Sequence, residues 1–341
     1  MKLISSFTRV LQYLPGELSH FIALKGLKII YKIGILGFLI NNVGPSNNQS
    51  GLSEKIKFDY VNNQLGIAAG LDKNAEYVDC LALLGIGFIE VGTVTPRPQP
   101  GNPKPRIFRN RKEKYLINRL GFNNKGVDNL VENLKKRKSS LPVGISIGKN
   151  FDTKNDQASD DYLICMEKVY EYASYVAINI SSPNTKDLRD LSNKEYLDTL
   201  LKKLKRKQSD LSKDLGYKPL YIKLSPDEEL HKLEEICEII LNNNIDGIIC
   251  CNTTVKHNYK NGQGGLSGSP LTDRAIEVLM LVRKIVGSDF PLIASGGVMS
   301  VADYQQRIEA GADLVQIYTG FIFEGPKLIE DINLTSIQRN T

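Results

Sequence analysis

Histidine is scarce in this sequence, and the functions that depend on it are disfavoured. The 341 residues include only His20, His231 and His257. The stretch NISSPN (179–184) follows an apolar run and carries two serines, but no histidine lies near it in the sequence. A Ser-His-Asp hydrolase is therefore a poor first hypothesis, because its serine needs a histidine base.

Cysteine pairs of the kind that bind metals are also missing. The five cysteines form no CxxC pair and no spacing typical of metal ligands. This pattern predicts a reducing compartment, no bound metal, and cysteines that serve as small core residues. They are Cys80, Cys165, Cys237, Cys250 and Cys251.

Long apolar runs and nucleic-acid motifs are absent as well. No run reaches the ~18 to 20 apolar residues that span a bilayer, so we expect the body of the protein to be soluble. The net charge is +6, and the densest basic runs lie at 135–138 and 202–207, in helix-like segments without interleaved aromatics. We interpret them as solvated helix faces and predict no nucleic-acid partner.

The N-terminal segment differs from the rest of the chain. Its apolar residues recur at helical spacing as far as Leu14, Pro15-Gly16 interrupts them, and a second apolar segment covers 18–40. We predict a helical hairpin in a segment 1–45, the linker NNVGPSNNQSG at 41–51, and a body over 46–341. Because the hairpin has five basic residues against one acid and no spanning run, we expect it to lie on a membrane. A helical cap packed on its own domain is the alternative.

Short apolar runs alternate with helical patterns through the body, as expected of repeated βα units. Eight such runs over roughly 250 residues or more predict an α/β fold, a closed (β/α)8 (TIM) barrel with an N-terminal helical extension. An open doubly wound sheet is the alternative. The runs are LGIAAG (65–70), GFIEVGTV (87–94), VGISIG (143–148), YVAINI (175–180), PLYIKL (219–224), DGIICC (246–251), PLIASG (291–296) and DLVQIY (313–318).

Polar residues and glycines follow nearly every run. In a barrel these strand ends meet on one face, so we predict a shared site there. Glycines after the last two runs predict a phosphate-bearing ligand, and 264–268 reads as a second flexible loop. Lys73 and Lys223 could hold the phosphate, neutralise charge on a cofactor, or form a Schiff base, as in an aldolase. Several asparagines suit a planar ligand with amide edges.

Six motifs resemble the quinone-dependent (class 2) dihydroorotate dehydrogenases over almost the whole chain. They are AAGLDKN (68–74), EVGTVTPRPQPGN (90–102), NRLGFNN (118–124), INISSPNT (178–185), GGLSG (264–268) and LVQIYTGFIFEGP (314–326). The resemblance implies an FMN enzyme of pyrimidine biosynthesis that oxidises dihydroorotate to orotate and reduces a membrane quinone. It also implies peripheral attachment to a membrane, facing the cytoplasm of a bacterial-type cell.

The family motifs assign roles to individual residues. Ser182 would take the proton from ring C5, and Thr185 and Phe122 would shape a path for that proton. Ligands of the substrate would be Lys73, Asn118, Arg119, Leu120, Gly121, Phe122, Asn179, Asn184, Asn252 and Thr253. Ligands of FMN would be Ala69, Gly70, Leu71, Asp72, Lys73, Thr93, Ser146, Asn179, Lys223, Cys251, Gly268, Gly297, Tyr318 and Thr319.

Two of these residues depart from the family pattern. Ser146 stands in place of asparagine, and Cys251 stands in place of threonine. A smaller polar group and a weaker hydrogen-bonder are expected to loosen the cofactor unless backbone contacts compensate. A Schiff-base aldolase and a barrel that binds a nucleotide without catalysis remain the alternative functions.

Overall fold

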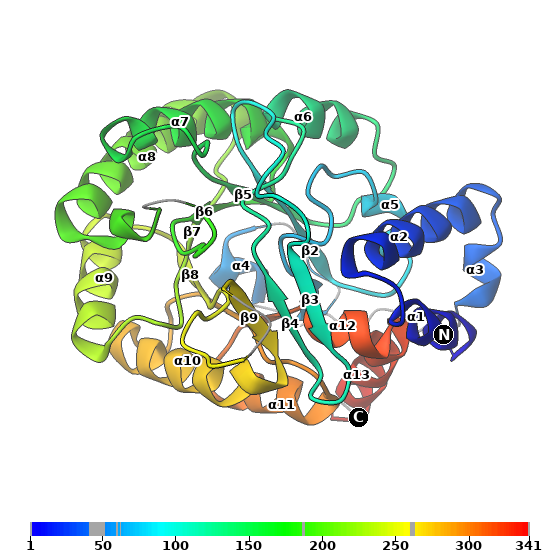
Figure 1. The fold of residues 1–341 in the computed structure, drawn as a ribbon. Helices are drawn as coiled ribbons and strands as arrows, with labels where there is room; N and C mark the ends of the chain where they lie inside the picture. The colour runs from blue at the N-terminus through cyan, green and yellow to red at the C-terminus, as the bar shows by residue number, and fades with distance from the viewer. Residues whose placement is uncertain are drawn as a thin grey trace.

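All eight apolar runs form strands, and these strands close into a barrel (Figure 1). The computed structural model describes residues 2–40, 52–58, 61, 63–185, 188–259 and 263–339, so the predicted linker at 41–51 lies outside them. Every neighbouring pair is parallel, in the order β1-β11-β10-β8-β7-β6-β5-β2, and β1 also pairs with β2. The barrel prediction is confirmed, and the open sheet is wrong. The barrel strands are β1 (Leu65–Ile67), β2 (Phe88–Val94), β5 (Val143–Ile147), β6 (Tyr175–Asn179), β7 (Leu220–Lys223), β8 (Gly247–Cys250), β10 (Leu292–Ser295) and β11 (Leu314–Ile317).

Helices surround the barrel and bury one apolar face each (Figure 1). In α8, Leu197, Leu200, Leu201 and Leu204 are buried at helical spacing, whereas most of the basic run at 202–207 faces solvent, as predicted. The surrounding helices are α5 (Val78–Ala82), α6 (Val127–Lys135), α7 (Ala158–Val169), α8 (Lys194–Leu215), α9 (Leu230–Asn242), α10 (Thr272–Val286), α11 (Val301–Glu309), α12 (Thr319–Glu324) and α13 (Pro326–Arg339). Single 3-10 turns are η1 (Asn155–Gln157), η2 (Tyr170–Tyr172), η3 (Leu188–Ser192) and η4 (Ser269–Leu271).

The amino-terminal end of the barrel is filled with aromatic rings. Tyr175 and Tyr221 lie 5.2 Å apart between ring centroids. Gly144 makes room for the Tyr175 ring, because a Cβ there would lie 2.0 Å from it. Helix α4 (Leu52–Ile56) covers this end, and the Tyr221 hydroxyl donates to the Ile56 carbonyl oxygen at 2.9 Å. A ligand must therefore enter from the carboxyl ends of the strands.

A small antiparallel sheet lies over those carboxyl ends. Its strands are β3 (Ile107–Asn110), β4 (Tyr115–Asn118) and β9 (Gly265–Gly268), in the order β3-β4-β9. The interpretation of 264–268 as a flexible loop is wrong for its last four residues. Their hydrogen bonds come from β4, almost 150 residues away, a pairing that the local glycine pattern does not reveal.

The predicted N-terminal hairpin is present as α1 (Lys2–Leu11) and α2 (Gly16–Lys32), followed by α3 (Leu36–Leu39). One face packs on the barrel, where the Gln12 side chain donates to the Phe323 carbonyl oxygen at 2.7 Å and Arg106 pairs with Glu17 at 2.9 Å. Among the described residues, no helix is long and apolar enough to cross a membrane. The outer face of the hairpin and its continuation exposes Phe7, Val10, Tyr13, Leu18, Phe21, Ile29, Ile33 and Ile35.

Candidate active site

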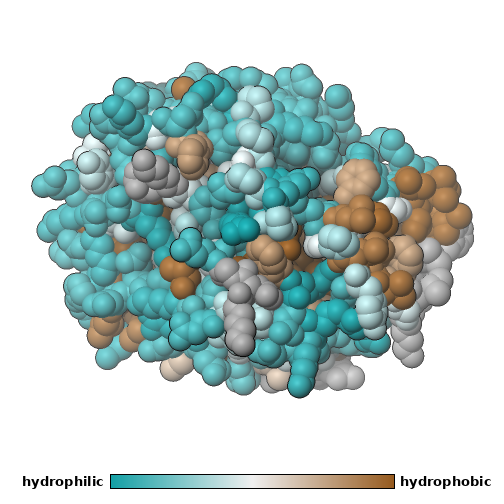
Figure 2. Space-filling model, in the orientation of Figure 1, coloured by the Kyte–Doolittle hydropathy of each residue, from teal (hydrophilic) through white to brown (hydrophobic). Residues whose placement is uncertain are grey.

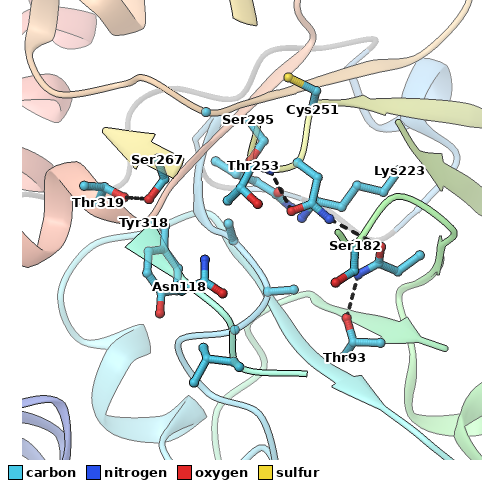
Figure 3. Close-up of a pocket in the computed structure, with 18 of the residues that line it drawn as sticks. Thr93, Asn118, Ser182, Lys223, Cys251, Thr253, Ser267, Ser295, Tyr318 and Thr319 are labelled. Carbon is cyan, nitrogen blue, oxygen red and sulfur yellow. Dashed lines mark hydrogen bonds between the residues drawn. The ribbon is translucent and has the colours of Figure 1, made fainter. Parts of the chain in front are cut away.

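A cavity at the carboxyl ends of the strands brings most of the predicted site residues together (Figure 3). Ser182 lies on one side of it, and Tyr318 and Thr319 lie on the opposite side. Its lining includes Ala69, Gly70, Lys73, Thr93, Asn118, Leu120, Gly121, Phe122, Asn179, Ser182, Asn184, Lys223, Cys251, Asn252, Thr253, Gly297, Tyr318 and Thr319. Residues that belong to every quarter of the sequence therefore share one site.

Ser182 lies in the loop that follows β6. The residue is 6% exposed, and its Oγ accepts a hydrogen bond from the Asn184 backbone N–H at 3.3 Å. The Asn184 side chain in turn donates to Asn118 Oδ1 at 3.2 Å, which ties the loop to β4. No histidine lines the described cavity. The serine is thus held by amides and not by an imidazole.

A second set of amides fixes the floor beside that loop. The Asn179 side chain donates to Thr93 Oγ1 at 2.8 Å, and its Oδ1 accepts from the Ser181 hydroxyl at 3.2 Å. The Asn252 side chain donates to Ser181 Oγ at 3.1 Å. Because the N–H group and the Oδ1 of each amide have hydrogen-bond partners, both side chains are held in defined orientations toward the cavity.

The far wall of the cavity is backbone that only glycine allows. Gly296 and Gly297 have φ of +98° and +70°, and a Cβ on Gly297 would lie 2.4 Å from Thr272 Cα. Beside them, the Thr319 hydroxyl donates to Ser267 Oγ at 2.8 Å. This wall offers backbone N–H and hydroxyl groups at the place where barrels commonly bind phosphate.

Comparison with known proteins explains why the serine loop, the amides and the glycine wall occur together in one cavity. The profile of the family described as dihydroorotate dehydrogenase matches residues 52–338. The chain belongs to the dihydroorotate dehydrogenase family. The dihydroorotate dehydrogenase (quinone) of Vibrio parahaemolyticus is 52% identical over 277 residues, which cover 79% of this chain and 82% of that protein.

Two further relatives cover nearly the whole chain. The dihydroorotate dehydrogenase (quinone) of Neisseria meningitidis is 43% identical over 330 residues, or 95% of this chain and 96% of that protein. That span is too long to leave out the N-terminal hairpin. The crystal structure of the DHODH of Eimeria tenella in complex with ferulenol has a TM-score of 0.81 and 32% identity, covering 95% of this chain and 92% of that one.

Some of the predicted site residues lie outside the cavity lining. The Asp72 carboxylate accepts from the backbone N–H groups of Glu76 and Tyr77, and burial raises its pKa to about 6. The Arg119 guanidinium donates to the Pro105 carbonyl oxygen. The buried Thr185 hydroxyl has no hydrogen-bond partner among the described residues. The set outside the lining is Leu71, Asp72, Arg119, Ser146, Thr185 and Gly268, and the roles predicted for these six remain predictions.

The two departures from the family pattern occupy different positions. Ser146 lies behind the cavity wall, where its hydroxyl and that of Thr93 are 2.8 Å apart. Cys251 lines the cavity, and burial raises the pKa of its thiol to about 12, so the thiol is neutral. Its backbone N–H donates to the Ser295 carbonyl oxygen at 2.8 Å.

Sequence reasoning missed part of the lining and one acidic residue behind it. Glu90 is fully buried behind Lys223, at 3.2 Å. Glu90 and Gln316 are polar residues in the middle of apolar runs, a signal that could have identified both. The other residues missed were Ala68, Ser267, Leu271, Ser295 and Val298, whereas Gly296 and Gly320 belong to the strand-end glycines that predicted a phosphate-bearing ligand.

A second cavity lies between the N-terminal helices and the small sheet. It shares Asn118, Ser267 and Tyr318 with the first cavity. Burial, and after it the charge of Lys73, lower the pKa of His20 in its wall to about 4, so the imidazole is neutral at pH 7. The rest of the lining is mostly apolar: Thr8, Leu11, Gln12, Gly16, Ser19, Ala23, Leu24, Leu71, Ile107, Arg109, Leu116, Phe321 and Ile322.

Proposed function

We propose that this enzyme oxidises dihydroorotate to orotate in pyrimidine biosynthesis, with FMN in the barrel cavity and a membrane quinone as the final electron acceptor. Membership of the dihydroorotate dehydrogenase family makes the protein an oxidoreductase of a flavin-dependent family. The observation that carries the finer proposal is one cavity that presents Ser182 on one side and the Gly296-Gly297 wall on another.

The cavity fits a flavin nucleotide. Gly297 and Thr319 offer donors for a phosphate, and Lys223 offers a cation for the electron-rich ring. Gln316 Oε1 is a buried acceptor with no partner among the described residues, as expected where a ligand supplies the donor. When bound, FMN supplies the acceptor for a hydride from the substrate.

The amides around Ser182 fit a substrate ring with carbonyl and N–H groups. Asn118, Asn184 and Asn252 would orient the ring, and the Lys73 ammonium would bind a carboxylate. Ser182 Oγ would then take the proton from C5 of dihydroorotate. A hydroxyl is a weak base at neutral pH, so it must pass the proton on. The unpartnered hydroxyl of Thr185 is suited to that relay, and Phe122 shields the path.

The second cavity and the outer face of the hairpin fit a quinone that arrives from a membrane. Figure 2 shows apolar residues gathered over the N-terminal helices, where Phe21 and Ile29 are more than half exposed. Such a surface can lie in the apolar layer of a membrane without crossing it. The Arg109 guanidinium in the cavity wall provides donors for a quinone oxygen, and Tyr318 separates this cavity from the first.

The purified protein should contain FMN, and its visible absorbance should bleach when dihydroorotate is added without oxygen. The reason is that every residue proposed for this step lines the barrel cavity or lies in the loop beside it. Flavin absorbance recorded before and after the addition tests the proposal, with orotate as a control that cannot supply a hydride. Protein that folds but carries no flavin would contradict it.

Orotate affinity should fall as the pH rises through about 8. Burial, and after it the charge of Arg106, lower the pKa of the Lys73 ammonium to about 8. The charged form is present below that pKa and is lost above it, so affinity should be level near pH 7 and fall by up to tenfold per pH unit above 8. Titration of orotate into Lys73→Arg is the control, because arginine stays charged and its profile should be flat. A flat profile in the parent would remove Lys73 from carboxylate binding.

A further inference from the structure

Glu90 is a carboxylate at the centre of the barrel, enclosed behind the cavity wall. It lies in β2, and its exposed fraction is 0%. A buried carboxylate is costly unless it is paired and its oxygens accept hydrogen bonds. The partners of Glu90 therefore show which groups the barrel holds in place with this buried side chain.

Three strands direct a donor at the two oxygens of Glu90. Oε1 accepts from the Lys223 ammonium of β7 at 3.2 Å. Oε2 accepts from the Tyr175 hydroxyl of β6 at 3.0 Å and from the Gln316 side-chain N–H of β11 at 2.8 Å. The Gln316 Nε2 also donates to the Tyr175 hydroxyl oxygen at 3.1 Å. Burial and the neighbouring Glu90 raise the pKa of Tyr175 well above its usual range, so Tyr175 remains a neutral donor.

These contacts fix two groups that line the cavity. The Gln316 side-chain Nε2 donates to Glu90 and Tyr175, and its Oε1 is left without a partner among the described residues. Lys223 is 5% exposed, and Glu90 is the partner of its one described ion pair. A lysine ammonium sits on a flexible stem, so a fixed partner is what holds it in one position. Glu90 thus determines both the direction of an acceptor and the position of the Lys223 ammonium.

We propose that Glu90 is a positioning residue for the flavin: it holds the Lys223 ammonium in place beside the ring and turns the Gln316 carbonyl oxygen toward the ring. The inference rests on the proposed binding of FMN in this cavity. A cation beside the ring favours reduced over oxidised flavin, because reduction adds negative charge there. Glu90 therefore raises the reduction potential of the flavin even though its own charge is negative.

The test is the reduction potential of the FMN holoenzyme, measured at pH 8 by equilibration with a reference dye. Glu90→Gln should lower the preference for reduced over oxidised FMN at least tenfold, which is about 30 mV for a two-electron couple. Tyr175→Phe is the matched control, because it removes one donor to the same carboxylate without changing a charge. Its preference for reduced over oxidised FMN should stay within roughly threefold of the parent value, which is about 15 mV in reduction potential.

A double-mutant cycle with Lys223→Met identifies the route of the effect. Lys223→Met should lower the potential in the parent but change little in the Glu90→Gln background, where the ammonium is no longer held beside the ring. If Glu90→Gln does not fold, the charge-free pair Glu90→Gln/Lys223→Met replaces it, because a buried ion pair can often be exchanged for neutral residues. The double variant should show the same lowered potential.

The opposite results are equally specific. A Glu90→Gln or double variant with the parent potential would limit Glu90 to a structural role, and a raised potential would make it a countercharge that disfavours reduction. Either result overturns the inference while leaving the proposed function intact, provided that dihydroorotate still bleaches the bound FMN. Folded parent protein without FMN would instead contradict the proposed function.

Discussion

Ser182→Ala should slow the reduction of the flavin by dihydroorotate by roughly 10² to 10⁴, the usual contribution of a positioned base. Ser182 Oγ lines the cavity and accepts one weak hydrogen bond, from the Asn184 N–H at 3.3 Å, so its loss should leave the fold unchanged. FMN content should also be unchanged. Stopped-flow absorbance under anaerobic conditions measures the step directly, apart from quinone reduction.

The neighbouring serine provides a matched control. Ser181 Oγ donates to Asn179 and accepts from Asn252, and Ser181 is not among the residues that line the described cavity. Ser181→Ala should therefore slow flavin reduction far less than Ser182→Ala, because it only loosens the side chains of Asn179 and Asn252. Cysteine at position 182 should give a partial rescue at best. Flavin reduction at the parent rate in Ser182→Ala would exclude Ser182 as the base.

Deletion of residues 1–45 should separate the two half-reactions. Every residue proposed for reduction of the flavin lies after Leu65, so bleaching by dihydroorotate should survive. Reduction of a long-tailed quinone should fall roughly tenfold or more, because burial of one Phe or Leu side chain contributes about 1.5–3 kcal/mol and the exposed face carries several. The truncated protein should also leave lipid vesicles, whereas high salt should weaken the binding of the parent only in part.

Ala23→Phe in the full-length protein separates the cavity from the membrane surface. Ala23 lines the second cavity, so a larger side chain should block the quinone while vesicle binding and flavin bleaching persist. Steady-state quinone reduction, vesicle sedimentation and anaerobic bleaching are measured on all three proteins after their folding has been checked. Truncated protein that reduces the long-tailed quinone as well as the parent would make the hairpin a packing cap.

The sequence predicted the elements of the barrel well because their signals are local. The eight apolar runs form eight strands, and the break at Pro15-Gly16 separates α1 from α2. Because the carboxyl ends of barrel strands meet on one face, the sequence also predicted a common site for residues as distant as Lys73 and Thr319. The Schiff-base aldolase, which the two lysines alone left open, is set aside by membership of the dihydroorotate dehydrogenase family. The residues next to Lys73 and Lys223 in the chain could not decide whether each lysine binds a phosphate, neutralises charge on a cofactor or forms a Schiff base.

Only the tertiary structure decided which polar groups meet. Glu90 and Lys223 lie 133 residues apart, and their pairing depends on barrel closure, which brings β2, β6, β7 and β11 to one axis. Closure likewise placed Ser146 behind Thr93, and pairing with β4 turned 265–268 into a strand. Local periodicity reports which face of an element is apolar, but not which distant side chain will face it. The charge of a buried group depends on those distant partners, and so the electrostatics of this site emerge only with the closed barrel.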